Sequence, residues 1–224
     1  MTAIRPWRCP TQTVSCISIT ATRQDPVPGT TANRSASLQP PAIRQNLLPY
    51  AEQLEHRPLE SVNLAVIHCT ELPDLSLARV YGERTHYPES ETGNSGHFYI
   101  ERNGEIERWV PEERIAHHVR GYNRRSVGIE LVNQGRYPDW LDSRSQAMTE
   151  PYPVTQLRSL YRLLHFLHVR LPALRHVAGH DALDTERVPA SDDPGITVFR
   201  KRDPGPLFPW DDLLSRTGLN RFLP

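Results

Sequence analysis

Residues 62–68 read Val-Asn-Leu-Ala-Val-Ile-His, a β-branched, apolar run that ends in a histidine. Such a run is typical of a buried strand. Two more runs, residues 127–132 and 176–180, have the same character, and the second of them also ends in a histidine. The three runs predict strands of one sheet, two of which deliver a histidine at their ends.

A hairpin is predicted farther along the chain. Residues 96–101 and 106–110 are strand-like runs, and they flank Asn103 and Gly104. Asn-Gly between two such runs is the strongest short-range hairpin signal.

The longest predicted helix covers residues 154–170, where leucines recur at steps of three and four. Shorter helices are expected at residues 75–86, with Asp74 as the N-cap, and near residues 210–215. Strands in hairpins together with helices between strands predict an α/β fold, a mixed central β-sheet flanked by helices.

The chain has 224 residues, of which 38% are hydrophobic and 23% are charged, and its net charge is zero. This length favours one domain. The chain has no excess of basic residues, which argues against a nucleic-acid-binding protein. It also has no run of 18 apolar residues, so no transmembrane helix is predicted. The stretch after Arg5 and Arg8 lacks the apolar region of a secretory signal, so a cytoplasmic protein is expected, with export by another route as the alternative. A monomer is the simplest expectation for the oligomeric state.

The N-terminal part differs in composition from the rest. Residues 1–45 are rich in Pro, Ser, Thr and Arg and are predicted to be a low-complexity, poorly ordered extension, followed by one domain over residues 46–224. The three cysteines, Cys9, Cys16 and Cys69, are odd in number, which argues against a disulfide framework.

His68 and His180 are the best candidates for metal ligands. A catalytic zinc site needs three protein ligands and an open fourth position. Each of these histidines ends an apolar strand and would face a cleft at the sheet edge. Taken alone, either one is more often an ordinary core or surface histidine.

Five motifs in a fixed order add context. They are residues 67–70 (Ile-His-Cys-Thr), 95–98 (Ser-Gly-His-Phe), 118–131 (His-Val-Arg-Gly-Tyr-Asn-Arg-Arg-Ser-Val-Gly-Ile-Glu-Leu), 179–180 (Gly-His) and 201–206 (Lys-Arg-Asp-Pro-Gly-Pro). Together they resemble the N-acetylmuramoyl-L-alanine amidase family, which includes anhydromuramyl-peptide recycling amidases, phage amidase lysozymes and peptidoglycan recognition proteins. The resemblance covers residues 60–210.

The resemblance implies that His68, His180 and Asp203 bind Zn²⁺. Asp193 is an alternative, because Pro-Gly also follows it. Only Asp203 has a second proline after the glycine and a lysine two positions before it. The spacing between His180 and Asp203 is longer than in the recycling amidases, which predicts a proline-rich insertion at the rim of the cleft.

Glu130 and Lys201 are the predicted catalytic residues. Glu130 interrupts an apolar run, where a carboxylate is unfavourable unless it is paired or functional, and the resemblance also points to it as general base. Its alternative role is a salt bridge inside the cleft. Lys201 is the single lysine among 26 basic residues. It is expected to stabilise the oxyanion, although an exposed surface lysine is the alternative.

Three further residues are expected to contact the substrate. His118 matches a cleft histidine of the family, with its neighbour His117 as the less favoured choice. Asn123 is expected to contact muramyl or peptide amide groups. His97 lies where some relatives have an active-site neighbour, but Gly96 replaces the tyrosine of the phage enzymes, so a tyrosine-assisted mechanism is not expected.

The resemblance thus implies zinc-dependent hydrolysis of the amide between N-acetylmuramic acid, or its 1,6-anhydro form, and the L-alanine of peptidoglycan stem peptides, with muropeptides as substrate. A non-catalytic peptidoglycan-binding module of the same fold is the alternative, and the loss of one ligand would be its sign. Other zinc hydrolases are disfavoured because His-Glu-x-x-His and Pro-Cys-x-x-Cys are absent.

Overall fold

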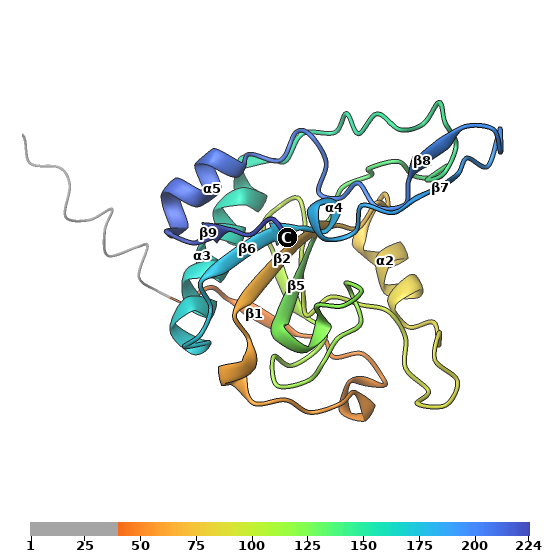
Figure 1. Cartoon of the computed structure of the whole chain (residues 1–224). Coiled ribbons are helices and arrows are strands. Elements are labelled where there is room, and N and C mark those ends of the chain that lie inside the picture. Colours follow the sequence, from red (N-terminus) through yellow and green to blue (C-terminus); the bar gives the residue numbers. More distant parts are fainter. Residues whose placement is uncertain (1–39) are drawn as a thin grey trace, which may run out of the picture. The chain divides into compact units, whose positions relative to one another are not determined.

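The structure, a computed structural model, describes residues 40–224, and a seven-stranded sheet lies at their centre (Figure 1). The strand order is β1-β4-β3-β5-β2-β6-β9. The strands are β1 Ile43–Gln45, β2 Leu64–Cys69, β3 Phe98–Ile100, β4 Ile106–Arg108, β5 Ser126–Leu131, β6 His176–Gly179 and β9 Asn220–Arg221. All neighbours are parallel except β3 and β4, which are antiparallel. The predicted mixed sheet is confirmed.

The three predicted helices are present, and α4, His180–Leu183, is an additional short helix that was not predicted. Helix α3 spans Val154–Arg170, and its buried leucines pack on the sheet. The others are α2 Leu75–Gly82, α4 His180–Leu183 and α5 Trp210–Thr217, with 3-10 helices at Ala51–Gln53, Leu59–Ser61 and Asn123–Arg125. Asp74 caps α2 by accepting the Leu77 N–H at 2.7 Å. Helix α2 ends earlier than predicted because the polar residues after Gly82 extend no apolar face. Among the described helices, none is both long and apolar enough to cross a membrane.

Side chains of β2 alternate between the two faces of the sheet. Ala65, Ile67 and Cys69 pack in the main hydrophobic core with α3 and α5. Leu64 and Val66 pack in a smaller cluster on the opposite face. Because successive strand residues point to opposite faces, His68 lies on the face away from α3. The same alternation keeps Cys69, a free and buried cysteine, in the core.

The predicted hairpin is present between β3 and β4. Ile100 pairs with Ile106, and Gly104 in the turn has a φ of 92°, a left-handed conformation that favours glycine. Strand β1 pairs with β4 and so belongs to the sheet, whereas the sequence analysis assigned residues 43–45 to the poorly ordered extension. A strand of three residues is too short to show an alternating pattern, so the sequence did not indicate it. The remainder of that predicted extension, residues 1–39 with Cys9 and Cys16, lies outside the described residues.

The insertion between His180 and Asp203 contains a second hairpin. Strand β7, Arg187–Pro189, pairs antiparallel with β8, Thr197–Phe199, where the sequence predicts only a proline-rich loop. The two strands bury one side chain, Val198. Without an alternating apolar pattern, the sequence gives no strand signal.

A buried ion pair connects the turn after β2 to the end of this hairpin. The Arg136 guanidinium donates to both carboxylate oxygens of Glu71, with Nε–Oε1 at 2.6 Å and Nη2–Oε2 at 2.8 Å. It also donates to the carbonyls of Phe199 at 2.9 Å and Arg200 at 3.3 Å. The pair therefore holds the residues just before Lys201 against the end of β2.

We expect Arg136→Met to lower the free energy of unfolding by about 3–5 kcal/mol, because it leaves the buried Glu71 carboxylate without its partner. Urea denaturation measures the change. Arg144→Ala is the matched control: Arg144 makes the same two-pronged contact with Asp142, but its side chain is 79% exposed. This control should show no measurable change. Equal losses in the two variants would contradict the role assigned to the buried pair.

Candidate active site

His68 and Glu130 lie side by side on the face of the sheet away from α3. Strands β2 and β5 are parallel, and their register pairs these two residues. His68 Nδ1 is 3.9 Å from Glu130 Oε1, and the Glu130 side chain is 14% exposed. Both residues line a cleft of about 700 Å³. Strand alternation thus delivers an imidazole and a carboxylate to one surface.

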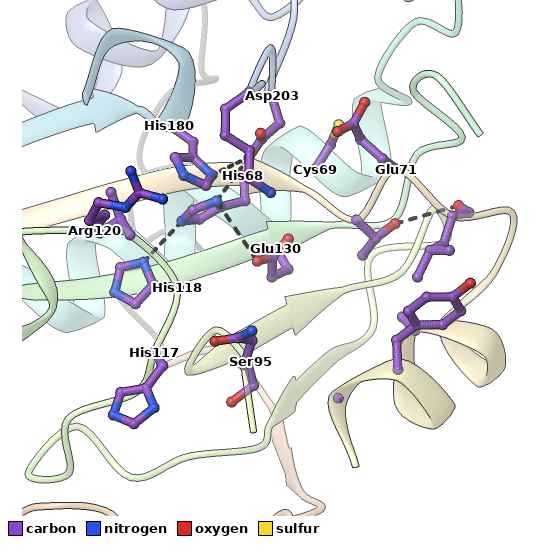
Figure 2. Close-up of a pocket in the computed structure, with 18 of the residues that line it drawn as sticks. His68, Cys69, Glu71, Ser95, His117, His118, Arg120, Glu130, His180 and Asp203 are labelled. Atoms are coloured by element: carbon purple, nitrogen blue, oxygen red, sulfur yellow. Dashed lines mark hydrogen bonds and ion pairs between the residues drawn. The ribbon is translucent and has the colours of Figure 1, made fainter. Parts of the chain in front are cut away.

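His180 and Asp203 complete a three-residue cluster with His68 (Figure 2). His180 begins α4 directly after β6, and the Asp203 carbonyl accepts the Asp181 N–H at 2.9 Å. One oxygen, Asp203 Oδ2, lies 2.9 Å from His68 Nδ1 and 3.1 Å from His180 Nδ1. One ligand atom from each residue lies within 4.8 Å of the other two, and all three residues are buried.

The chemistry of this cluster suits a bound cation. Burial lowers the pKa of His68 to about 4, which leaves its ring neutral at pH 7. Burial acts to raise the pKa of Asp203, but the charge of His180 and hydrogen bonds from His180 and His68 outweigh it and hold that pKa well below its usual range. Asp203 Oδ1 is buried without a hydrogen-bond partner. A neutral imidazole and an ionised carboxylate are the forms that bind metals.

Asp193, the alternative ligand, lies elsewhere. It is exposed in the turn between β7 and β8, where its Oδ1 accepts the Gly195 N–H at 2.8 Å. The structure brings Asp203, and not Asp193, to the two histidines.

Glu130 and Lys201 border the cluster from the cleft. Burial raises the pKa of Glu130 to about 8, repulsion by Asp203 adds to this shift, and the Lys201 charge opposes it. A cation held by the neighbouring cluster would lower this pKa by Coulomb attraction. Lys201 is half-buried, and its charge acts on both Glu130 and His68.

His118 and Asn123, two of the predicted substrate contacts, line the cleft. His118 Nδ1 lies 3.0 Å from His68 Nε2. Asn123 Oδ1 accepts the main-chain N–H groups of His118 at 3.1 Å and Val119 at 2.8 Å. His117 also lines the cleft, but Figure 2 shows it apart from the His68 cluster.

His97 is not brought to the cleft with the others. It is fully buried, its Nδ1 accepts the Gly128 N–H at 3.0 Å, and its Nε2 donates to the Arg114 carbonyl at 3.1 Å. Nε2 also lies 2.9 Å from Arg57 Nη2, so both ring nitrogens are used within the protein.

Three residues that were not predicted as site residues also line the cleft: Glu71, Tyr81 and Trp140. The Trp140 indole N–H donates to the Glu71 carbonyl at 3.0 Å, and its ring meets Tyr81 edge-on at 6.2 Å between centroids. The one sequence feature that could have indicated these lining residues is Trp140, a large aromatic side chain in an otherwise polar loop.

Comparison with known proteins identifies the family. The family model for N-acetylmuramoyl-L-alanine amidase matches residues 58–206, more than half of the chain. The chain belongs to this family. The matched range contains every predicted site residue, from His68 to Asp203.

Individual amidases are similar to the chain. It is 33% identical over 124 residues to N-acetylmuramoyl-L-alanine amidase AmiD of Escherichia coli K12, a match that covers 51% of this chain and 39% of that relative. The match therefore spans well under half the length of the relative.

Solved amidases share the fold. N-acetylmuramoyl-L-alanine amidase LysC from Clostridium intestinale superposes with a TM-score of 0.58 at 21% identity, covering 80% of this chain and 99% of LysC. The Escherichia coli AmiD complex with the substrate anhydro-N-acetylmuramic acid-L-Ala-D-gamma-Glu-L-Lys gives a TM-score of 0.53 at 22% identity, covering 73% of this chain and 59% of AmiD.

Close packing of the His118 ring on β5 makes Gly128 a test of the site geometry. A Cβ built on Gly128 would lie 2.7 Å from His118 Cγ. We expect Gly128→Ala to displace the ring and lower the free energy of unfolding by about 1–3 kcal/mol, measured by urea denaturation. Gly195→Ala, whose Cβ would meet only the Asp193 carboxylate, should unfold like wild type. A Gly128→Ala variant of wild-type stability would show that the ring is not packed in this way.

Proposed function

We propose that this protein uses zinc to hydrolyse the amide between N-acetylmuramic acid, or its 1,6-anhydro form, and the L-alanine of peptidoglycan stem peptides, in cell-wall recycling or turnover. The observation that carries the proposal is the convergence of His68, His180 and Asp203 beside Glu130 and Lys201 in one cleft. Membership of the amidase family supports the choice of bond.

His68, His180 and Asp203 would hold the zinc ion. Two imidazole nitrogens and one carboxylate oxygen form a donor set used by catalytic zinc sites, where three protein ligands leave a fourth position open. When bound, zinc supplies Lewis acidity, which lowers the pKa of water to about 7 and polarises an amide carbonyl. The unpartnered Asp203 Oδ1 supports a ligand role for this carboxylate.

Glu130 would move the proton. In amide hydrolysis a base must take a proton from the attacking water and deliver it to the leaving nitrogen, here that of L-alanine. The Glu130 carboxylate borders the three proposed ligands and reaches the cleft. Within residues 40–224 its ion-pair partner is His68 at 3.9 Å, and no arginine or lysine neutralises it at salt-bridge distance. This favours a proton-transfer role over a structural salt bridge.

Lys201 would stabilise the developing oxyanion. Attack on the amide places negative charge on the carbonyl oxygen, and a positioned cation lowers the barrier most when it is already in place. The chain at Arg200 is held by Arg136, so the neighbouring Lys201 backbone is fixed at the cleft. A compact ammonium on a flexible stem suits this role.

The substrate class follows from the relatives. AmiD is named for the same bond, and its solved complex holds an anhydromuramyl tripeptide. We extend that substrate class to this chain, with Asn123 as the proposed contact because it lines the cleft. Its Oδ1 is already used by the main chain, so its amide N–H groups are the atoms we propose as donors to the substrate. A non-catalytic peptidoglycan-binding module is the alternative outcome of the tests below.

Metal affinity tests the proposed ligands. Wild-type protein should bind one zinc ion per chain, and Asp203→Ala should weaken binding on the order of 100-fold or more because one of three ligands is lost. Competition with a chromophoric chelator measures the dissociation constant. Asp193→Ala makes the same change at the other Asp-Pro-Gly and should bind zinc like wild type. Loss of zinc in Asp193→Ala with retention in Asp203→Ala would reverse the assignment.

Digestion of two substrates tests the reaction. Zinc-loaded protein should release free stem peptide from anhydromuramyl tripeptide or from intact peptidoglycan, as detected by mass spectrometry, and a chelator should abolish the release. Glu130→Gln should lower kcat by about 10²–10⁴ through loss of the base. Lys201→Met should lower it by about 10²–10³.

His168→Gln, a change on the exposed face of α3, is the control and should leave the rate unchanged. Zinc content is measured for each variant, so that loss of metal is separated from loss of catalysis. Zinc-loaded wild type that binds peptidoglycan and releases nothing would favour the binding module.

A further inference from the structure

Part of the cleft is lined by apolar and aromatic side chains that belong to one hydrophobic cluster, namely Leu72, Ala78, Tyr81 and Trp140. Leu72 precedes α2, Ala78 and Tyr81 lie on that helix, and Trp140 lies in the loop after β5. We call this set the aromatic wall. Tyr81 and Trp140 are only partly buried, so the wall keeps surface that a ligand can cover. Covering apolar surface that is otherwise in contact with water is favourable.

The Trp140 side chain is held from several sides. Its indole N–H donates to the Glu71 carbonyl at 3.0 Å. Its ring meets the rings of Tyr81 and Tyr137 edge-on, with centroids 6.2 and 5.7 Å away. The Gln146 side-chain amide donates to the Trp140 carbonyl at 3.0 Å and so holds its main chain. A side chain that is already fixed loses little conformational entropy when a ligand binds. Trp140 is therefore preorganised as a flat platform in the cleft.

The main chain beside Trp140 is fixed by Glu71. Glu71 has a φ of 49°, a left-handed conformation that is uncommon for a residue with a side chain and persists only where its surroundings hold it. Its carboxylate is held by Arg136, and its carbonyl accepts the Trp140 N–H. Glu71 follows His68 by three residues, a span of at most about 11 Å. The wall therefore lies close to the ligand cluster, within reach of a sugar ring that is joined to the reacting amide by its lactyl ether.

The two sides of the ligand cluster differ in the charge they offer. Figure 2 shows Glu71 and Arg120 on opposite sides of His68. Beside Glu71, the Arg136 guanidinium is already neutralised by two hydrogen bonds to that carboxylate. Arg120 is paired with Glu186 at 2.9 Å, but these side chains are 71% and 44% exposed, and an exposed pair of this kind is weak. A ligand with one uncharged part and one anionic part would therefore place the first at the wall and the second toward Arg120.

A muropeptide has these two parts. The Escherichia coli AmiD complex holds one such substrate, anhydro-N-acetylmuramic acid-L-Ala-D-gamma-Glu-L-Lys. In a molecule of this kind the sugar ring offers the largest uncharged C–H surface. The stem peptide carries the negative charge, because a γ-linked glutamate leaves its other carboxylate free.

We propose that Trp140 and Tyr81 form a subsite for the muramyl ring, which lies with its C–H face against the indole while the stem peptide extends toward Arg120. The inference rests on the proposed function and adds the direction in which the substrate lies. The two rings touch the sugar and not the reacting amide, so they determine specificity for the sugar and take no part in the chemical step.

A pair of substrates tests this subsite. The first is anhydromuramyl tripeptide, and the second is the lactyl tripeptide, which keeps the same amide and the same peptide but has no sugar. Trp140→Ala should lower kcat/KM for the first about 10-fold, mainly through a higher KM, as is typical of the loss of a buried aromatic contact. It should leave kcat/KM for the second unchanged. Free anhydro-N-acetylmuramic acid should inhibit wild type, and its inhibition constant should rise about 10-fold in Trp140→Ala.

Two further variants separate the aromatic face from other effects. Trp140→Phe keeps an aromatic face but loses the hydrogen bond to Glu71, and it should retain most of the preference for the sugar. Phe199→Ala is the matched control, because Phe199 is an aromatic residue that is 37% exposed and does not line the cleft. It should behave like wild type with both substrates. Thermal unfolding of each variant separates an effect on the subsite from a loss of fold.

The outcomes distinguish the subsite from the proposed function. Equal losses on the two substrates in a folded Trp140→Ala variant would show that the wall serves the peptide or the loop, and would overturn the sugar subsite while the amidase function stands. Unchanged kcat/KM for anhydromuramyl tripeptide in that variant would do the same. Failure of zinc-loaded wild type to release peptide from any muropeptide would overturn the proposed function, and the subsite with it.

Discussion

Two imidazole rings meet one buried carboxylate oxygen, Asp203 Oδ2, at 2.9 and 3.1 Å, and the surrounding fold is organised to make this possible. An ionised carboxylate without compensating partners is strongly unfavourable in a protein interior. The parallel pairing of β2 and β6 supplies the partners, because its register sets Ile67 opposite Gly179, and the next residue in each chain segment is a histidine. The carboxyl ends of parallel strands are where open α/β sheets generally bind ligands.

Asp203, the third residue of the cluster, belongs to no strand, so its position is fixed in a different way. Its carbonyl is held by the Asp181 N–H, and the Tyr152 hydroxyl donates to the Pro204 carbonyl at 2.6 Å. The Glu71–Arg136 pair fixes the chain a few residues earlier. These contacts lie on several elements, so the carboxylate is placed by tertiary structure and not by local conformation.

This division explains what could be predicted from the sequence. The apolar strands, the Asn-Gly hairpin and the leucine spacing of α3 are local patterns, and the structure confirms each of them. His68 and His180 could be placed together because each follows an apolar strand of the same sheet, and Glu130 could be placed beside them because strand residues alternate between the two faces. The β7–β8 hairpin and the Glu71–Arg136 pair were not predicted, because they depend on long-range contacts. His97 shares the cleft-side face of β3 with Tyr99 by alternation, but the segment that carries Arg114 covers it, which no periodicity reveals.

The β7–β8 hairpin leaves the ligand cluster at His180 and returns to it before Asp203. Its base is fixed by the Arg200–Asp184 ion pair and by the donation of Arg136 to the Phe199 carbonyl, whereas residues 191–196 at its tip are exposed. Lengthening a loop that is anchored at both ends has an entropic cost that grows only with the logarithm of its length. Evolution can therefore lengthen, shorten or replace the tip of this hairpin while its two anchored ends keep His180 and Asp203 in place.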